Sequence, residues 1–206
     1  MVDVDKVPEL SFVLVEGALI FAPNVNPNHQ SYFDAGYIFV SGGYMEVGTE
    51  EFPYTSKITI TMHGDVTTPA IPTYGNKNIA VRNGELHLVG KERKVTWTML
   101  DKTANAGDIT ITLQSQAVGA FDWTIGEEIV IASTSFDHNE AETRFITAVG
   151  SDSVDSTKPK LTLSSQLNYK HYAATETYGS DTIEIRAEVG LLTRNVKYQG
   201  DPETSP

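Results

Sequence analysis

Apolar and polar residues alternate with a period of two through most of this sequence. The segment 57–64, KITITMHG, places Ile58, Ile60 and Met62 on one face of an extended chain. Similar runs occur at 37–40, 95–100, 107–113, 127–134, 160–165, 182–189 and 195–198, and no segment has sustained helical periodicity. Successive side chains of a strand point to opposite faces, so this pattern is typical of half-buried strands. The sequence therefore predicts an all-β chain.

One short phrase occurs three times, each time around a glycine. The copies read Leu14-x-x-Gly17-x-Leu19-x-Phe21, Val40-x-x-Gly43-x-Met45-x-Val47 and Val81-x-x-Gly84-x-Leu86-x-Leu88. The glycines of the first two copies are 26 residues apart. A spacing in the mid-twenties suits one coil of a parallel β-solenoid, in which each coil buries its inward residues on the next. The second, longer step leaves room for an extra strand at 57–64 and a proline-containing loop at 67–78.

The repeat favours a right-handed parallel β-helix, and a β-sandwich is the alternative. A sandwich also has many short strands joined by glycine-containing turns at regular spacing. Glycine at a fixed place in each coil would supply a corner with positive φ, or would let neighbouring backbones approach closely. We also expect Trp97, within a strand, to pack in the core.

Composition narrows the possible partners. The 206 residues include 15 basic and 27 acidic ones, a formal charge of −12, which repels phosphate backbones and anionic membranes. Nucleic acid is therefore not expected as a partner. The chain has no cysteine, which excludes disulfides, thiolate zinc sites and cysteine nucleophiles.

The two ends of the chain give expectations about domain organisation. Met1 is followed by alternating valine and aspartate rather than by a basic, apolar leader, and no segment is as long and apolar as a membrane-spanning helix. This fits a cytosolic protein or an excised domain. We expect residues 1–9 to be a lead-in, 10–200 one domain, and 201–206 a linker or tail.

The polar segment 134–145 is the strongest candidate for chemistry or binding. It follows an apolar strand and contains Asp137, His138, Glu140, Glu142 and Arg144. Carboxylates beside a histidine and an arginine can transfer protons or hold a sugar acid. The alternative, which we favour, is that these charges cap turns and form exposed ion pairs of little energetic value.

Metal and cofactor sites are not expected. His63 and His87 both point away from the core in the alternating pattern and would face one another if their coils stack, but no ligand spacing accompanies them. Surface aromatic rings are the other candidates for a binding role, because they can stack on sugars or anchor a partner. They are Tyr32, Phe33, Tyr37, Tyr44, Phe52 and Tyr54, for which core packing is the default.

Several phrases taken in order resemble the G8 domain of fibrocystin-type proteins, which is related to the hyaluronan-processing family of the cell migration-inducing protein. They lie at 17–21, 35–65, 78–100, 107–113, 123–146 and 183–196. The wording at 47–65, followed by 95–100, is closer to the fibrocystin-L branch. The resemblance covers roughly 10–200. It assigns the family's recurrent glycines to Gly17, Gly36, Gly42, Gly43, Gly48, Gly84, Gly90, Gly107, Gly126 and Gly190.

The resemblance implies an extracellular, all-β module of a very large membrane-anchored protein, beside parallel β-helix repeats. The expected function is then non-catalytic: a structural or ligand-binding unit whose partners are neighbouring ectodomains, an extracellular glycan or a protein. The alternative is a domain that binds or depolymerises a hyaluronan-like polysaccharide. Fold alone does not decide between them.

Overall fold

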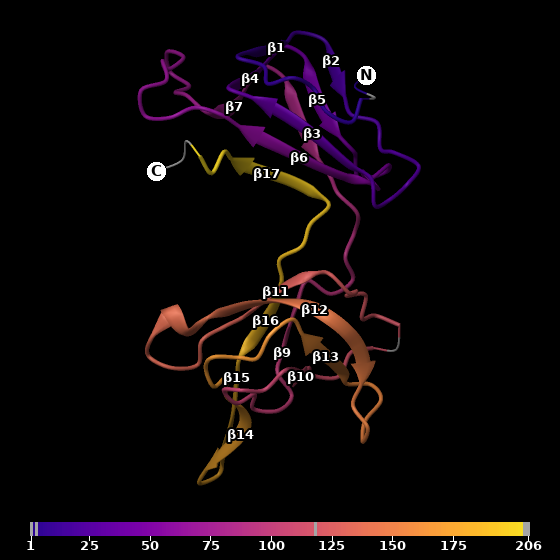
Figure 1. The fold of residues 1–206 in the computed structure, drawn as a ribbon, viewed down its shortest axis with the longest axis vertical. Coiled ribbons are helices and arrows are strands. Elements are labelled where there is room, and N and C mark those ends of the chain that lie inside the picture. Colours follow the sequence, from indigo (N-terminus) through magenta and orange to yellow (C-terminus); the bar gives the residue numbers. More distant parts are fainter. Residues whose placement is uncertain (1, 3, 118, 204–206) are drawn as a thin grey trace. The chain divides into compact units, whose positions relative to one another are not determined.

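The chain folds into two compact units built from strands. The computed structural model describes residues 2, 4–117 and 119–203 (Figure 1). Over those residues it contains strands β1 to β17 and one short 3-10 helix, η1, so the all-β prediction is confirmed. Unit 1 comprises residues 1–92 and 194–206, and unit 2 comprises residues 93–193. Each unit has its own hydrophobic core.

Unit 1 consists of three parallel sheets of three strands each. Their orders are β1-β4-β7, β2-β5-β8 and β3-β6-β17, and every pairing in them is parallel. Consecutive strands belong to different sheets, so the chain passes through the three sheets in the same order three times. Each pass, with one strand in each sheet, is called a circuit here. The strands are β1 (Val13–Val15), β2 (Ala18–Ile20), β3 (Gln30–Ala35), β4 (Tyr37–Ser41), β5 (Tyr44–Val47), β6 (Lys57–Met62), β7 (Asn78–Arg82), β8 (Glu85–Leu88) and β17 (Val196–Gly200).

Alternate residues of these strands fill the core of unit 1. Ile58, Ile60 and Met62 are each no more than 1% exposed, as the period-two pattern predicts. Ile60 of β6 lies opposite Phe33 of β3, so inward residues stack from one strand onto the next. The same inward stacking buries Ile38, Val40, Met45 and Val47.

The strand β6 is not the extra strand that the longer repeat suggested. It pairs with β3 and occupies the same place in the second circuit as β3 does in the first. The additional length lies in the loop 63–77 between β6 and β7, whereas β3 and β4 are joined through Gly36 alone. The loop 67–78 predicted from its prolines lies in this connection except for its last residue, Asn78, which begins β7.

Unit 2 is inserted at one corner of unit 1. The second and third strands of the first two circuits are joined by residues 21–29 and 48–56, whereas in the third circuit residues 89–195 lie between β8 and β17. The side chain of Asn195 joins the two ends of the insertion: Oδ1 accepts from the Lys91 N–H (2.9 Å), and Nδ2 donates to the carbonyls of Tyr54 (2.6 Å) and Ser56 (2.8 Å). The insertion therefore leaves and re-enters unit 1 at one place.

The three glycine phrases stack at a second corner. Tyr44 N–H donates to the Gly17 carbonyl (2.8 Å), and Glu85 N–H donates to the Gly43 carbonyl (3.1 Å). A Cβ on Gly43 would lie 2.2 Å from the Gly17 oxygen, and one on Gly84 would lie 2.4 Å from the Gly43 oxygen. Close backbone approach explains these two glycines. Positive φ angles occur instead at Gly42, Gly48, Gly107 and Gly126.

The predicted alignment of the three phrases is confirmed for the residues that follow the glycine. For the residues that precede the glycine, it is wrong in the first copy. Beyond the glycine, the aligned residues Leu19, Met45 and Leu86 do lie opposite one another. Before it, Val40 pairs with Val15 rather than with Leu14, which is 49% exposed. The first corner is one residue shorter than the other two, and this places Val15 at the inward position.

Unit 2 is antiparallel, so the parallel pairing that a solenoid requires is limited to unit 1. Its six-stranded sheet has the order β10-β13-β12-β11-β16-β9. The edge strands β9 and β10 are joined by hydrogen bonds from Asp101 N–H to the Thr112 carbonyl and from Gln114 N–H to the Met99 carbonyl, so the sheet curls round upon itself. The strands are β9 (Trp97–Met99), β10 (Thr110–Thr112), β11 (Glu128–Ile131), β12 (Glu142–Ser151), β13 (Pro159–Leu163) and β16 (Glu188–Leu191), with η1 (His138–Glu140) before β12 and a hairpin of β14 (Ala173–Tyr178) and β15 (Asp181–Arg186).

The core of unit 2 contains Trp123, not Trp97. Trp123 is 3% exposed and its indole N–H donates to the Val95 carbonyl (2.7 Å). Trp97 lies on the strand β9 and is 55% exposed, whereas its neighbour Thr98 faces inward. The expectation that Trp97 packs in the core is therefore wrong, because in β9 the side chain of Thr98, and not that of Trp97, faces inward.

We predict that Gly43→Ala destabilises unit 1 and that Gly17→Ala does not. The new methyl group at Gly43 would overlap the Gly17 carbonyl, which is fixed by the corner hydrogen bond, so the free energy of unfolding should fall by about 2 kcal/mol or more. At Gly17 a Cβ would meet nothing within 4 Å, so the change should stay within about 0.5 kcal/mol. Urea denaturation followed by far-UV circular dichroism measures both, and equal losses would contradict the close-approach explanation.

We also predict that unit 1 folds when residues 93–193 are replaced by a flexible linker of about four Gly and Ser residues. The hydrogen bond between Lys91 and Asn195 shows that the ends to be joined are adjacent. The shortened chain should give a strand-type circular dichroism spectrum and dispersed amide NMR signals. Collapsed amide signals would mean that unit 1 depends on unit 2 for folding.

Candidate functional site

The structure separates the five residues of the predicted polar site into two groups. Asp137 caps η1, and its carboxylate accepts from the Asn139 N–H (2.9 Å). His138 is exposed and Glu140 is half-buried, both within η1. Glu142 and Arg144 instead lie on β12 and contact each other. The five residues therefore do not converge on one site.

Glu142 is the centre of a buried hydrogen-bond network. Its carboxylate contacts an Nη2–H of Arg144 and accepts from the backbone N–H groups of Asn168 and Tyr169 at 2.9 to 3.0 Å. It also lies 3.1 Å from Nε2 of His171, whose side chain is fully buried. Each oxygen of the carboxylate is therefore held by protein donors.

His171 is oriented by a second acceptor. Its Nδ1 lies 2.8 Å from the carbonyl oxygen of Ala132, which can only accept. Because Nε2 faces the Glu142 carboxylate, both ring nitrogens lie within hydrogen-bond distance of an oxygen. The buried carboxylate of Glu142 is therefore held between the imidazole of His171 and the guanidinium of Arg144.

The network lowers the pKa of Glu142. Burial alone would raise the pKa of this carboxyl, but the N–H groups of Asn168 and Tyr169, His171 and the charge of Arg144 together hold it below the ordinary 4.5. With Glu142 4% exposed and His171 fully buried, no substrate reaches either group. The network therefore stabilises the fold and is not placed for catalysis.

The two histidines expected to face one another are in different surroundings. His63 lies between Glu9 (3.8 Å), Asp34 (3.8 Å) and Asp201 (3.5 Å), whereas His87 lies 2.9 Å from Glu85 of its own strand. In the part of the chain that the structure describes, no group of three or more His, Asp or Glu side chains has the arrangement of a metal site.

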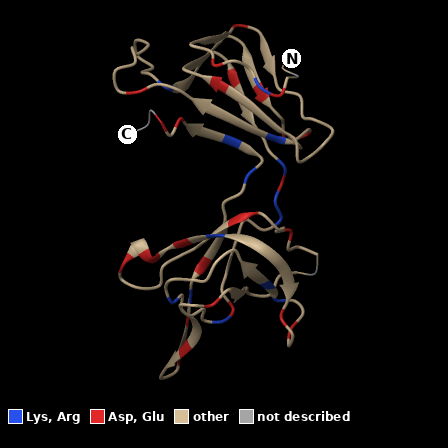
Figure 2. Cartoon of the chain, viewed as in Figure 1, with Lys and Arg blue, Asp and Glu red and all other residues tan. Residues whose placement is uncertain are grey.

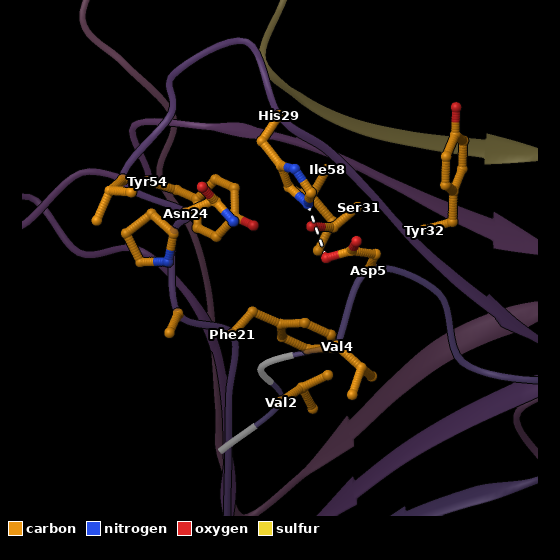
Figure 3. Close-up of a pocket in the computed structure, with 13 residues that line it drawn as sticks. Val2, Val4, Asp5, Phe21, Asn24, His29, Ser31, Tyr32, Tyr54 and Ile58 are labelled. Atoms are coloured by element: carbon orange, nitrogen blue, oxygen red, sulfur yellow. Dashed lines mark hydrogen bonds and ion pairs between the residues drawn. The ribbon is translucent and has the colours of Figure 1, made fainter.

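A pocket of about 260 Å³ in unit 1 was not singled out by the sequence (Figure 3). One wall is the N-terminal segment, which pairs with β3 at Lys6 and Leu10, and the other wall is the β2–β3 connection. The strands below supply buried side chains. The pocket is lined by Val2, Val4, Asp5, Phe21, Ala22, Pro23, Asn24, Val25, His29, Ser31, Tyr32, Tyr54 and Ile58.

The polar residues of this pocket come from three places: Asp5 from the segment expected to be a lead-in, Asn24 and His29 from the β2–β3 connection, and Ser31 from β3. His29 Nε2 lies 2.9 Å from an oxygen of Asp5, and Figure 3 shows this pair beside Ser31. Asn24 is held in a turn, where its Oδ1 accepts from the Asn26 N–H (2.9 Å). Of the six surface-aromatic candidates, Tyr32 and Tyr54 line the pocket, but Tyr54 and Phe33 are buried.

Comparison with known proteins identifies the family. The model of the G8 domain matches residues 1–101. The chain belongs to the G8 domain family, and the resemblance seen in the sequence is confirmed. It is 38% identical to Fibrocystin-L of Mus musculus and 39% identical to Fibrocystin-L of Homo sapiens, each over 196 residues, which are 94% of this chain and 4% of those proteins.

Relatives also occur outside animals. A G8 domain-containing protein of Dictyostelium discoideum is 33% identical over 174 residues, which are 82% of this chain and 10% of that protein. The G8 chain described here thus spans a small part of each of these relatives. In its described residues, the structure contains no helix with the length and apolar character needed to cross a membrane.

We predict that Glu142→Gln lowers the free energy of unfolding by about 3 kcal/mol at neutral pH, because it leaves the guanidinium of Arg144 without its counter-charge and disturbs the buried contact with His171. The pKa of Glu142 is lower folded than unfolded, so its contribution is present above the unfolded pKa and is lost as pH falls through the folded pKa. The difference between wild type and variant should therefore narrow below about pH 4.5.

Glu184→Gln is the matched control. Glu184 also pairs with an arginine two residues away, at 2.6 Å from Arg186, but its side chain is 53% exposed. Its replacement should cost less than about 1 kcal/mol. Chemical denaturation of the three proteins between pH 3 and pH 7 measures both effects, and a constant difference for Glu142→Gln across that range would contradict its assigned charge.

Proposed function

We propose that this chain is a non-catalytic, extracellular structural module of a large fibrocystin-like cell-surface protein. The observation that carries the proposal is the stack of parallel sheets in unit 1, in which the repeated motif serves backbone packing at the glycine corner. Support also comes from the similarity to Fibrocystin-L, of which this chain would form a small part. In this proposal the buried network of Glu142 and the helix cap of Asp137 have structural roles.

In this proposal unit 1 is a short right-handed parallel β-helix. Two facts support it: each circuit adds one strand to each of three sheets, and crossovers between parallel strands are almost always right-handed. The strands β7 and β8 end their sheets, and such edges can pair with strands of another domain. We therefore propose neighbouring ectodomains of the parent chain as partners, and one family domain over roughly 10–200 that includes unit 2.

Depolymerisation of a hyaluronan-like chain is the alternative that the structure supports less. A polymer of uronic acids needs basic side chains along its binding surface, whereas this chain has a formal charge of −12. Figure 2 shows acidic residues distributed over both units. His138 and Asp137 of the predicted polar site are both exposed, and the carboxylate of Asp137 already caps η1.

We predict that the purified chain leaves the size distribution of hyaluronan unchanged. The reasons are the formal charge of −12, which disfavours a polymer of uronic acids, and the positions of Glu142, which is buried, and of Asp137, whose carboxylate caps η1. Gel electrophoresis of size-resolved hyaluronan after prolonged incubation, with a known hyaluronidase as positive control, tests this. Shortening by the wild-type chain that His138→Ala abolishes would overturn the non-catalytic proposal.

A further inference from the structure

We propose that the pocket between the N-terminal segment and the β2–β3 connection is a binding site for one neutral sugar ring, a hexopyranose. This goes beyond the structural role proposed above and does not depend on it. The pocket is formed by three separate stretches of chain around Asp5, Asn24 and Ile58, and its volume is about 260 Å³. Pockets for drug-sized ligands hold roughly 300–1,000 Å³, so a single ring is the matching size.

The floor and one side of the pocket are apolar. Phe21 and Ile58 line it with 4% and 1% exposure, so their side chains are held rigidly by the core of unit 1. Phe21 packs edge-on against Phe33, with ring centroids 4.9 Å apart. Figure 3 shows Phe21, Val2 and Val4 on the side of the pocket away from His29. The C–H face of a pyranose is complementary to such a surface, and aromatic rings commonly supply it.

Polar groups gather on the opposite side. The Asp5 carboxylate uses one acceptor position on His29, and an ionised carboxylate has about four. The Oδ1 of Asn24 is held by Asn26, which orients the amide nitrogen and its two donors. Ser31 adds a hydroxyl that both donates and accepts. Sugar hydroxyls also donate and accept, so this mixed set suits them better than a ligand with one kind of polar group.

The charge of the pocket excludes acidic sugars and phosphates as its best ligands. The 13 residues that line it include neither Lys nor Arg, and its one histidine, His29, is already paired with Asp5, so little positive charge is left for an anion. The carboxylate of Asp5 is already paired with an imidazole at 2.9 Å, so it does not select strongly for a cation. Tyr32 stands at the margin with its ring directed away from Asp5 and Ser31, and it is not needed for the proposed contact.

The test titrates the 206-residue chain with neutral methyl glycosides of glucose, galactose and mannose, and with glucuronate and glucosamine as charged probes. Amide NMR signals should shift saturably at Asp5, Asn24 and Ser31 with at least one neutral probe below about 50 mM. Asp5→Asn should weaken the binding of that probe at least tenfold. Asp5 is exposed, so folding of the variant is expected and the same NMR spectra verify it.

Glu85→Gln is the matched control, because Glu85 pairs with His87 at the same 2.9 Å distance but lies outside the pocket. It should leave the affinity unchanged within twofold. Three outcomes overturn the proposal: no saturable shift at the pocket with any probe, binding of glucuronate or glucosamine at least as tight as that of the neutral probes, or equal weakening by the two variants.

Discussion

The close contact of backbones at the glycine corner fixes how unit 1 is assembled. Parallel strands in one sheet lie about 4.8 Å apart, and at this corner the backbone of each circuit lies directly on the carbonyl of the previous one. Hydrogen bonds to the carbonyls of Gly17 and Gly43 set the register there. Because the corner joins the first sheet to the second, the same contact determines which inward residues meet in both sheets. A side chain at Gly43 or Gly84 would push the circuits apart on both sides of the corner.

A different corner accommodates unit 2 without altering that register. The strand β17 takes the third place in its circuit although it follows β8 by more than a hundred residues of chain, and it still pairs in parallel with β6. Long insertions cost little when their two ends are already adjacent, since the entropy of closing a loop grows slowly with its length. Asn195 provides that adjacency through hydrogen bonds to Lys91, Tyr54 and Ser56.

The sequence predicted the strands well and their partners only in part. Period-two alternation located Ile58, Ile60 and Met62 in the core, and the glycine alignment placed Leu19 opposite Met45. Alternation is the same in parallel and antiparallel sheets, however, so it could not reveal that pairing changes direction in unit 2. Nor does it fix which residue faces inward in the run Val13-Leu14-Val15, where all three are apolar and Leu14 is exposed. In β9 the inward residue is Thr98, and Trp97 is exposed.

The residues of the predicted polar site are divided for a related reason, because nearness in sequence is not nearness in space. Asp137 and Glu142 are five residues apart, yet η1 turns the chain between them, and Glu142 faces the core while Asp137 stays at the surface. The group that Glu142 contacts, His171, lies 29 residues away and carried no local signal. A charge buried among such partners is fixed and inaccessible, whereas Asp5 and His29 lie 2.9 Å apart at the pocket that we propose as a binding site. Accessibility, not the density of charged residues, therefore separates the polar groups that hold this fold from those that remain able to bind.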